Sequence, residues 1–154
     1  MATIIFDNFR NAQLGVPGGT TTTVDFDADD IDADLLEGAG GDGVTHAVTH
    51  VDYDDVDGTA GNAVVADRAD SANVPLTSKT IGSVAVGVFD AADVTYSSIS
   101  GANDADYLTL RKYDATAANS TLILSFDSAT TGLPVTPNGG DITVTWNVSG
   151  ILGI

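Results

Sequence analysis

Apolar and polar residues alternate over short stretches of this chain, and this is the period of a β-strand with one face in a protein core. Glycine, proline and asparagine separate the stretches, as at Gly139 and Gly140, and mark turns. The pattern predicts strands at residues 20–27, 31–35, 81–89, 94–99, 107–113, 121–127 and 141–149. About seven or eight short strands bounded by turns are typical of an all-β fold, a sandwich or barrel-like arrangement of antiparallel sheets.

The alternation also predicts which side chains face the core. In the strand at 31–35, Ile31 and Leu35 are expected inside, and Asp32 and Asp34 are expected on a solvated face. In the last strand the same rule places four side chains inside, and these are Ile142, Val144, Trp146 and Val148. Trp146 is therefore expected to be a core residue.

The N-terminal part differs from the rest. Ile4 to Leu14 is expected to form a short amphipathic helix with Phe6 and Phe9 along one side, and the glycines and proline of residues 15–19 end it. Residues 44–74 have no clear period, so we expect irregular structure with one brief strand or helical turn. The chain, 1–154, is then predicted to be a single β domain, with an N-terminal helix or arm at 1–19 and a β-sandwich core at 20–154.

Acidic residues far outnumber basic ones, since 22 Asp and Glu oppose five Lys and Arg and the net charge is −17. Disorder of the whole chain is excluded because 43% of the residues are hydrophobic and many occupy strand positions. Six aspartates fall between Asp25 and Asp34, and alternate residues of a strand lie only about 6.7 Å apart. Nucleic acid is not expected as a direct partner, because a phosphate backbone needs a basic surface.

Neighbouring carboxylates repel each other less as the salt concentration rises. The Debye length is about 8 Å at physiological ionic strength and about 3 Å at 1 M, so such a surface is well screened only in brine. A high net charge keeps a protein soluble but destabilises its compact state by self-repulsion. We therefore predict adaptation to high salt, and a surface loaded with calcium is the alternative.

The sequence lacks the signals that are typical of several function classes. Cysteine is absent, and this excludes disulfides and thiolate chemistry. No stretch approaches the length of about 18 apolar residues that a membrane span needs, and residues 1–9 lack the pattern of a secretory signal, so no membrane partner is expected. The glycine and serine motifs of nucleotide-binding proteins and hydrolases are missing too, so we predict that the chain is not an enzyme and has no catalytic residues.

The weak candidates for metal ligands are two histidines and two aspartates. His46 and His50 are four residues apart, and Asp52 and Asp54 follow closely, so a helix there could direct these groups to one ion. However, the sequence VTHAVTHV around the histidines lacks the glutamate of a zinc hydrolase motif. We expect polar surface here rather than a metal site.

The acidic runs do not match the pattern of a calcium-binding loop either. A loop that starts at Asp25 has Asp30 where an EF-hand needs glycine, and Leu36 where it needs glutamate. No cofactor is therefore predicted. Non-specific association of cations with the carboxylates is expected, and a specific calcium site is not.

Five segments along the chain contain motifs that can be compared with those of known protein families. They are FDNFRNAQLG (6–15), HVDYDDV (50–56), VGVFDAADVTYSSISG (86–101), LTLRKYDATAANSTLILSFD (108–127) and GGDITVTWNVSGILGI (139–154). Together they resemble a family of small structural proteins encoded among the virion genes of tailed viruses. The most specific part is the GGDITVTWNVSGI ending preceded by FDAADVTY. The extreme acidity suggests a virus of a salt-loving host, and we expect a haloarchaeal one.

The resemblance implies a component of the virion, assembled in the host cytoplasm. The leading expectation is a capsid-associated decoration, turret or fibre-base protein that acts as a homo-oligomer and contacts the major capsid protein or other virion proteins. A tail or baseplate component is the second expectation. The third is a carbohydrate- or cation-binding module of a halophilic cell.

The first testable prediction is that stability depends on salt. The thermal midpoint is expected to rise between about 0.1 and about 3 M NaCl, because screening relieves the repulsion between carboxylates. Circular dichroism at stepped NaCl concentrations measures it, with millimolar CaCl₂ as the comparison. A midpoint that does not change with NaCl would contradict the prediction, and rescue by dilute calcium alone would favour discrete calcium sites.

Overall fold

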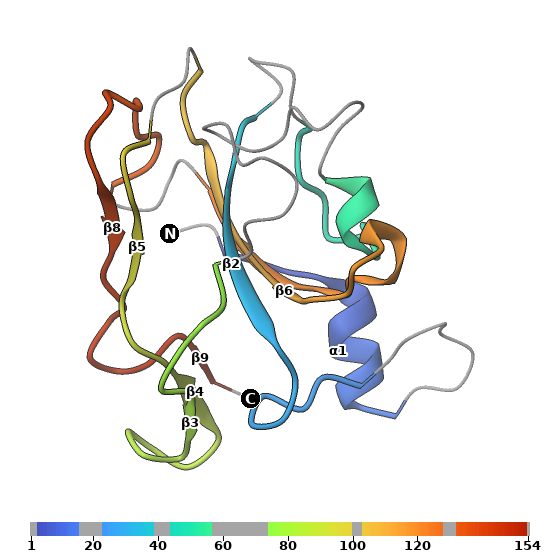
Figure 1. The fold of residues 1–154 in the computed structure, drawn as a ribbon. Helices are drawn as coiled ribbons and strands as arrows, with labels where there is room; N and C mark the ends of the chain where they lie inside the picture. The colour runs from blue at the N-terminus through green and yellow to red at the C-terminus, as the bar shows by residue number, and fades with distance from the viewer. Residues whose placement is uncertain are drawn as a thin grey trace.

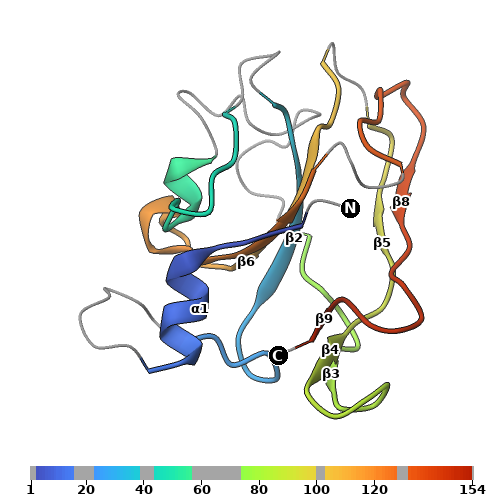
Figure 2. The ribbon, with the colours of Figure 1, turned by 180° about the vertical axis from the view of Figure 1, so that it is seen from behind.

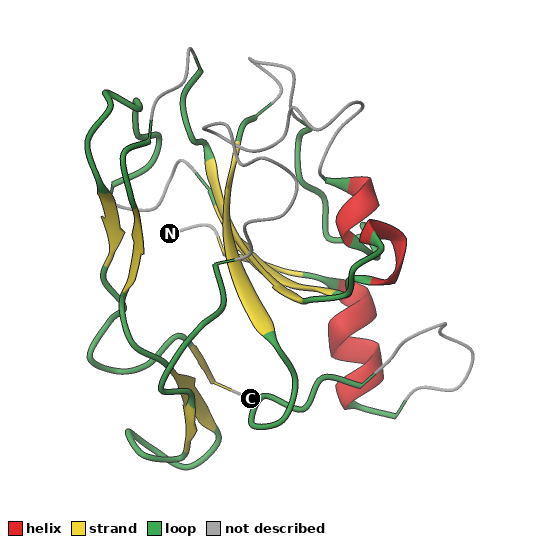
Figure 3. Cartoon of the chain, viewed as in Figure 1, coloured by secondary structure: helices red, strands yellow, loops and turns green. Residues whose placement is uncertain are grey.

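The computed structural model describes residues 3–15, 23–38, 44–56, 74–99, 103–127 and 132–153. These residues form nine β-strands in antiparallel sheets and one short helix, which confirms the predicted all-β fold, and they close no barrel (Figures 1 and 3). The elements are β1 (Thr3–Ile5), α1 (Asp7–Gln13), β2 (Ile31–Leu36), η1 (Tyr53–Asp55), β3 (Thr80–Ile81), β4 (Val88–Asp90), β5 (Val94–Tyr96), β6 (Tyr107–Lys112), η2 (Ala117–Asn119), β7 (Leu122–Phe126), β8 (Ile142–Val144) and β9 (Leu152–Gly153). The single turns η1 and η2 are 3₁₀ helices.

The largest sheet has four strands in the order β1-β7-β6-β2. Its longest pairing joins β2 to β6 and sets Asp32 opposite Arg111 and Asp34 opposite Thr109. Next to it, Thr109 of β6 lies opposite Ser125 of β7. This register determines which polar side chains meet on one face of the sheet.

Two small sheets, β3-β4-β9 and β5-β8, lie against the other face of the large sheet (Figure 1). The main core fills the space between them and draws residues from both layers, such as Ala33, Leu110 and Phe89. The hydroxyl of Tyr96 on β5 also donates to the carbonyl of Ala33 on β2 at 2.5 Å. The arrangement is therefore sandwich-like, with a four-stranded layer facing two smaller sheets.

A second, smaller apolar cluster lies on the opposite face of the large sheet. Its buried residues are Phe6, Leu36, Tyr53, Val56 and Leu122. Segment 51–56 covers this face, because the amide of Tyr53 donates to the carbonyl of Ser120 at 2.9 Å and that of Leu122 donates to Val51 at 3.3 Å. The helical turn expected somewhere in 44–74 is η1, and it belongs to this cover.

The N-terminal helix is shorter than predicted. Ile4 and Ile5 were expected in the helix, but they lie in β1 and pair with Ser125 and Leu124 of β7. β-branched residues suit an extended strand, and the free edge of β7 offers the backbone partners. Phe9 is buried on α1 as the amphipathic pattern predicts.

Two predicted strands are wrong in their extent. Within the described part of 20–27, Val24 and Phe26 are buried, but a turn at Asp25–Asp29 replaces the strand, because the Asp25 carboxylate accepts backbone N–H groups two and three residues later. The predicted strand at 81–89 is instead a hairpin, with β3 and β4 joined by residues 82–87. Gly82 and Gly87 have positive φ there, a conformation suited to turns.

The C-terminal strand is also shorter than expected. Ile142 and Val144 contact the core and Trp146 is half-buried against it, while Val148 is 91% exposed and lies in a turn. The chain then reverses at Gly150, where a Cβ atom would lie 2.2 Å from a methyl carbon of Val88. This close approach lets β9 pair with β4 and bury Leu152, so the C-terminal segment folds onto its own core.

Candidate functional site

A row of buried polar side chains crosses the face of the large sheet that segment 44–56 covers. It comprises Asp32, Asp34, Thr109, Arg111 and Ser125, all at most 5% exposed. The alternation predicted correctly that Asp32 and Asp34 point away from Ile31, Ala33 and Leu35. The prediction that this face is solvated was wrong, because loops from elsewhere in the chain enclose it.

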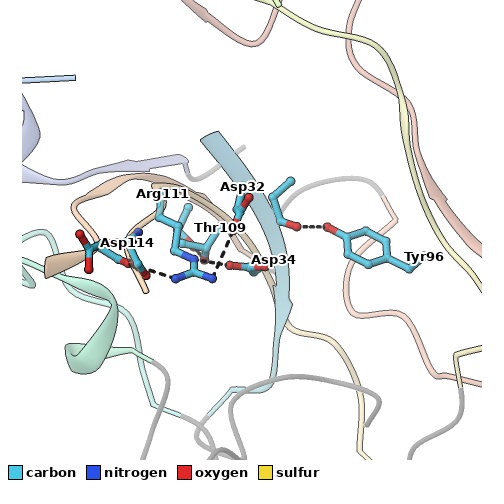
Figure 4. Close-up of polar contacts among 9 residues, drawn as sticks. Asp32, Asp34, Tyr96, Thr109, Arg111 and Asp114 are labelled. Carbon is cyan, nitrogen blue, oxygen red and sulfur yellow. Dashed lines mark hydrogen bonds and ion pairs between the residues drawn. The ribbon is translucent and has the colours of Figure 1, made fainter. Parts of the chain in front are cut away.

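Arg111 lies at the centre of the row (Figure 4). Its Nε donates to the Asp34 carboxylate at 2.7 Å, and its Nη2 lies 3.4 Å from the Asp32 carboxylate. The third group, Nη1, donates to the hydroxyl of Ser120 at 3.2 Å. All three nitrogens of the guanidinium therefore have partners, and both ion pairs are almost fully shielded from water.

Two tyrosine rings enclose the same guanidinium. Its central carbon lies 3.8 Å from the ring centre of Tyr53 and 5.3 Å from that of Tyr113. A cation held over an aromatic face gains electrostatic energy, and more so when water is excluded. Because Tyr53 belongs to the covering segment, Arg111 joins β2, β6 and the cover in one cluster.

His46 is buried at the other end of the row. Its Nδ1 lies 2.8 Å from the Ser125 hydroxyl, which lies 2.8 Å from that of Thr109, and its ring stacks on Tyr107 with centroids 3.8 Å apart. Within the described residues, Nε2 of His46 is buried without a hydrogen-bond partner. Burial, with a smaller contribution from His50, lowers the pKa of His46 to about 3, so the ring is neutral at ordinary pH.

The other predicted ligands do not converge on His46. The Nδ1 of half-buried His50 accepts the amide of Ala47 at 3.4 Å, and Asp54 is exposed. Burial, together with the charges of Asp55 and Asp54, raises the pKa of the Asp52 carboxyl. Across the described ranges, no three His, Cys, Asp or Glu side chains are grouped so that they could hold a metal ion.

The acidic run at 25–34 divides into buried and turn-forming residues. Asp32 and Asp34 belong to the Arg111 cluster, whereas Asp29 lies in the preceding turn and pairs with Lys112 at 2.8 Å. Lys79 donates to the backbone carbonyl of Asp29 as well. Burial raises the pKa of Asp29, but the hydrogen bond and charge of Lys112 and the backbone amide of Asp25 outweigh this and hold it below its ordinary value.

The small sheets carry an uncharged surface, in contrast to the acidic run at 25–34. Segments Thr80–Phe89 and Ile142–Gly153 contain no charged side chain, and we call their exposed part the neutral surface. Four of the six large hydrophobic residues that are exposed in the described chain lie on it: Ile81 at 55%, Val84 at 42%, Val86 at 99% and Val148 at 91%.

Acidic residues at the boundary of the neutral surface are tied to the backbone. The Asp93 carboxylate accepts the amide of Trp146 at 3.0 Å, and that of Asp141 accepts the amide of Ser98 at 2.8 Å. Both views of the ribbon place β3, β4 and β8 on the side of the molecule away from α1 (Figures 1 and 2). The segments 80–89 and 142–153 therefore present an uncharged surface with four exposed apolar side chains on an otherwise acidic protein.

Comparison with known proteins found no family model and no curated protein that matches this chain. Among the described residues, no helix is both long and apolar enough to cross a membrane.

The alternation of apolar and polar residues did not predict the Arg111 cluster or the neutral surface. A signal for the first was present, since Arg111 is one of only five basic residues and alternates with Leu108 and Leu110 in a strand. The signal for the second was the absence of charge from residues 80–89 and 142–153 in a chain of net charge −17. Neither signal says which segments come together.

Removal of the Arg111 cation is expected to cost much more than removal of an exposed one. Arg111→Met should lower the free energy of unfolding by about 3–5 kcal/mol, because two buried carboxylates lose their counter-charge. The triple variant Arg111→Met/Asp32→Leu/Asp34→Leu should recover most of this loss, since apolar side chains need no buried partner. Urea unfolding at a fixed, high NaCl concentration measures these differences.

The matched control is Arg10→Met. Arg10 pairs with Asp7 at 2.6 Å, but both side chains are about half exposed, so its loss should cost about 0–1 kcal/mol. Equal losses for Arg111→Met and Arg10→Met would contradict the central role of the buried cluster.

His46 should make stability depend on pH. Its folded pKa is about 3 and its ordinary value is 6.5, so below 6.5 the unfolded chain takes up a proton that the folded chain does not. Stability is then fully present above pH 6.5 and falls by up to about 1.4 kcal/mol per pH unit as pH decreases toward 3. Urea unfolding between about pH 7.5 and 5, above the ordinary aspartate pKa, measures this effect.

His46→Phe keeps an aromatic ring beside Tyr107 and removes the titrating group, so it should flatten the pH dependence in this range. His50→Gln leaves the buried ring in place and should retain most of the slope. An unchanged slope in His46→Phe would show that another group causes it.

Proposed function

We propose that this protein is a structural component of a tailed-virus particle, bound to the capsid as a decoration, turret or fibre-base protein in a high-salt environment. The observation that carries the proposal is the neutral surface. Three valines and an isoleucine are exposed in the two segments of this acidic chain that carry no charge, and exposed apolar surface on soluble proteins is used for interaction sites. A protein specialised for contact in this way suits an assembly role.

The resemblance to virion proteins supports the same proposal. Its two most specific segments, 89–96 and 139–151, supply part of β4 and all of β5 and β8. They form both small sheets together with β3 and β9. The residues that suggest a virion protein are thus those that build and flank the neutral surface.

The burial of the polar row also supports a structural role. Arg111 is 5% exposed and His46 is 6% exposed, and both are surrounded by side chains of their own chain. Their chemistry serves to hold the covering segment on the large sheet. Arg111 and His46 therefore contribute to the rigidity of the fold, and a repeated component of a particle requires such rigidity.

The distribution of charge supports adaptation to salt. The four basic residues of the described chain all have acidic or carbonyl partners, with Arg10 on Asp7, Lys79 and Lys112 on Asp29, and Arg111 in the buried cluster. Exposed aspartates such as Asp27, Asp30 and Asp54 remain on the surface. Their mutual repulsion is screened at about a 3 Å Debye length in 1 M salt.

Particle composition tests the proposal. Virions from a host culture that carries this gene, purified in high salt, should contain the protein at a fixed copy number relative to the major capsid protein by quantitative mass spectrometry. Separation of capsids from tails should leave it with the capsids. Its recovery with tails would favour a tail or baseplate component, and its absence from particles despite expression in the cell would refute the proposal.

A further inference from the structure

We infer that the side-chain amide of Asn147 is an attachment site for a sugar. The inference goes beyond the proposed function and does not depend on it. The motif Asn-x-Ser/Thr, in which x is not proline, marks asparagines that glycosyltransferases can modify. It occurs twice in this chain, as NST at residues 119–121 and as NVS at residues 147–149. The fold leaves only the second of these two motifs open to an enzyme.

The second motif lies wholly on the surface. Asn147 and Ser149 are exposed, and Val148 between them is 91% exposed. These residues lie between β8 and β9, in a turn where the amide of Gly150 donates to the carbonyl of Asn147 at 2.8 Å. An attached sugar is bulky and hydrated, so it requires a surface position of this kind.

The side chain of Asn147 is oriented along the motif. Its Oδ1 accepts the backbone amide of Ser149 at 2.9 Å, which draws the side chain toward the residue whose hydroxyl completes the motif. The bond uses the oxygen, and Nδ2 has no hydrogen-bond partner among the described residues. The nitrogen that would carry the sugar is therefore available. Asn103 differs, because its Nδ2 donates to the Glu37 carboxylate at 3.0 Å.

The first motif is enclosed by the fold, because Ser120 is 0% exposed and Thr121 is 6% exposed. The hydroxyl of Ser120 accepts from Arg111 at 3.2 Å and donates to the carbonyl of Asp114 at 3.0 Å. The carbonyl of Thr121 accepts the amide of Lys112 at 2.9 Å. An enzyme that recognises the hydroxyl at the third position of the motif therefore has no access to it here in the folded protein.

The composition around Asn147 gives the sugar a physical role. Exposed carboxylates hydrate much of this acidic chain, but residues 142–153 include no acid or base. Val148 is nevertheless exposed in that segment. A hydrated, neutral sugar on the adjacent residue would make this turn more polar without adding to the net charge of −17, whose self-repulsion already destabilises the compact state.

The reaction is the transfer of a phosphate-activated sugar. A bond forms between Nδ2 of Asn147 and the anomeric carbon of the sugar, and the bond from that carbon to a phosphate oxygen breaks. The nitrogen loses one proton to the solvent or to the departing phosphate. Activation is needed because the lone pair of an amide nitrogen is delocalised into its carbonyl. A nucleotide-linked and a lipid-linked sugar phosphate would give the same product.

Mass spectrometry of the protein from a host culture that carries this gene tests the inference. The tryptic peptide 113–154 contains both motifs, because no Lys or Arg follows Lys112. Fragmentation of this peptide should place a sugar on Asn147 and none on Asn119. An unmodified Asn147 in all of the isolated protein would overturn the inference, as would a sugar on the Ser149 hydroxyl instead or equal modification of Asn119.

Substitutions within the motif separate recognition by an enzyme from folding. Ser149→Ala removes the hydroxyl but keeps the backbone amide that donates to Asn147, so it should abolish the modification and leave the circular dichroism spectrum unchanged. Ser149→Thr keeps a hydroxyl and should remain modified. Asn119→Gln is the matched control and should not alter the modification. A sugar that persists on Asn147 in Ser149→Ala would contradict the inference.

Host extracts distinguish the two sugar donors. Transfer to the unmodified recombinant protein by the soluble fraction supplied with nucleotide sugars would indicate a nucleotide-linked donor, and transfer by the membrane fraction would indicate a lipid-linked one; either result supports the site. An unmodified chain that is present on particles would refute the sugar site alone. A modified chain that is absent from particles would refute the proposed virion role alone.

Discussion

The buried pairing of Arg111 with Asp32 and Asp34 is the interaction on which the structure of the large sheet depends, because it fixes which face of the sheet is polar and which is apolar. The desolvation of each of these charges costs several kcal/mol, so the cluster is stable only while all its members are held in place. The register of β2 against β6 sets Asp32 opposite Arg111, and Tyr53 closes the site from the covering segment. A slip of one residue would turn Asp32 and Asp34 into the apolar core, which gives the register a strong constraint.

The placement of the few cations shapes the surface as well. Arg111 is enclosed by the fold, and Lys79 and Lys112 hold the turn around Asp29. The described basic side chains therefore lie against the acidic first third of the chain or close to it. Residues 80–89 and 142–153 of the small sheets include neither acids nor bases, and Ile81, Val84, Val86 and Val148 remain exposed there. Internal charge pairing and the neutral surface are two parts of the same charge distribution.

Most strands could be predicted from alternation, because a period of two reflects a local property of the backbone. The strands β2, β5, β6, β7 and β8 all lie within predicted ranges or within one residue of them. Strand prediction was wrong where a turn with its own local hydrogen bonds replaced a strand, as at Asp25. It was also wrong where glycines divided an apolar run into a hairpin, as at Gly82 and Gly87. Ile4 and Ile5 show the reverse case, since a distant strand made them extended. The four candidate ligands are not grouped together in the described chain, since His46 is buried and Asp54 is exposed.

The sequence by itself determined the all-β character, the two-sidedness of the strands and the strong excess of negative charge. Those properties follow from the order and chemistry of neighbouring residues. The tertiary structure alone decided that the polar face at Asp32 and Asp34 is buried, that Val86 and Val148 are exposed, and that the C-terminal segment pairs with β4. Burial of a face depends on which distant segment covers it, and a periodic pattern carries no information about that segment.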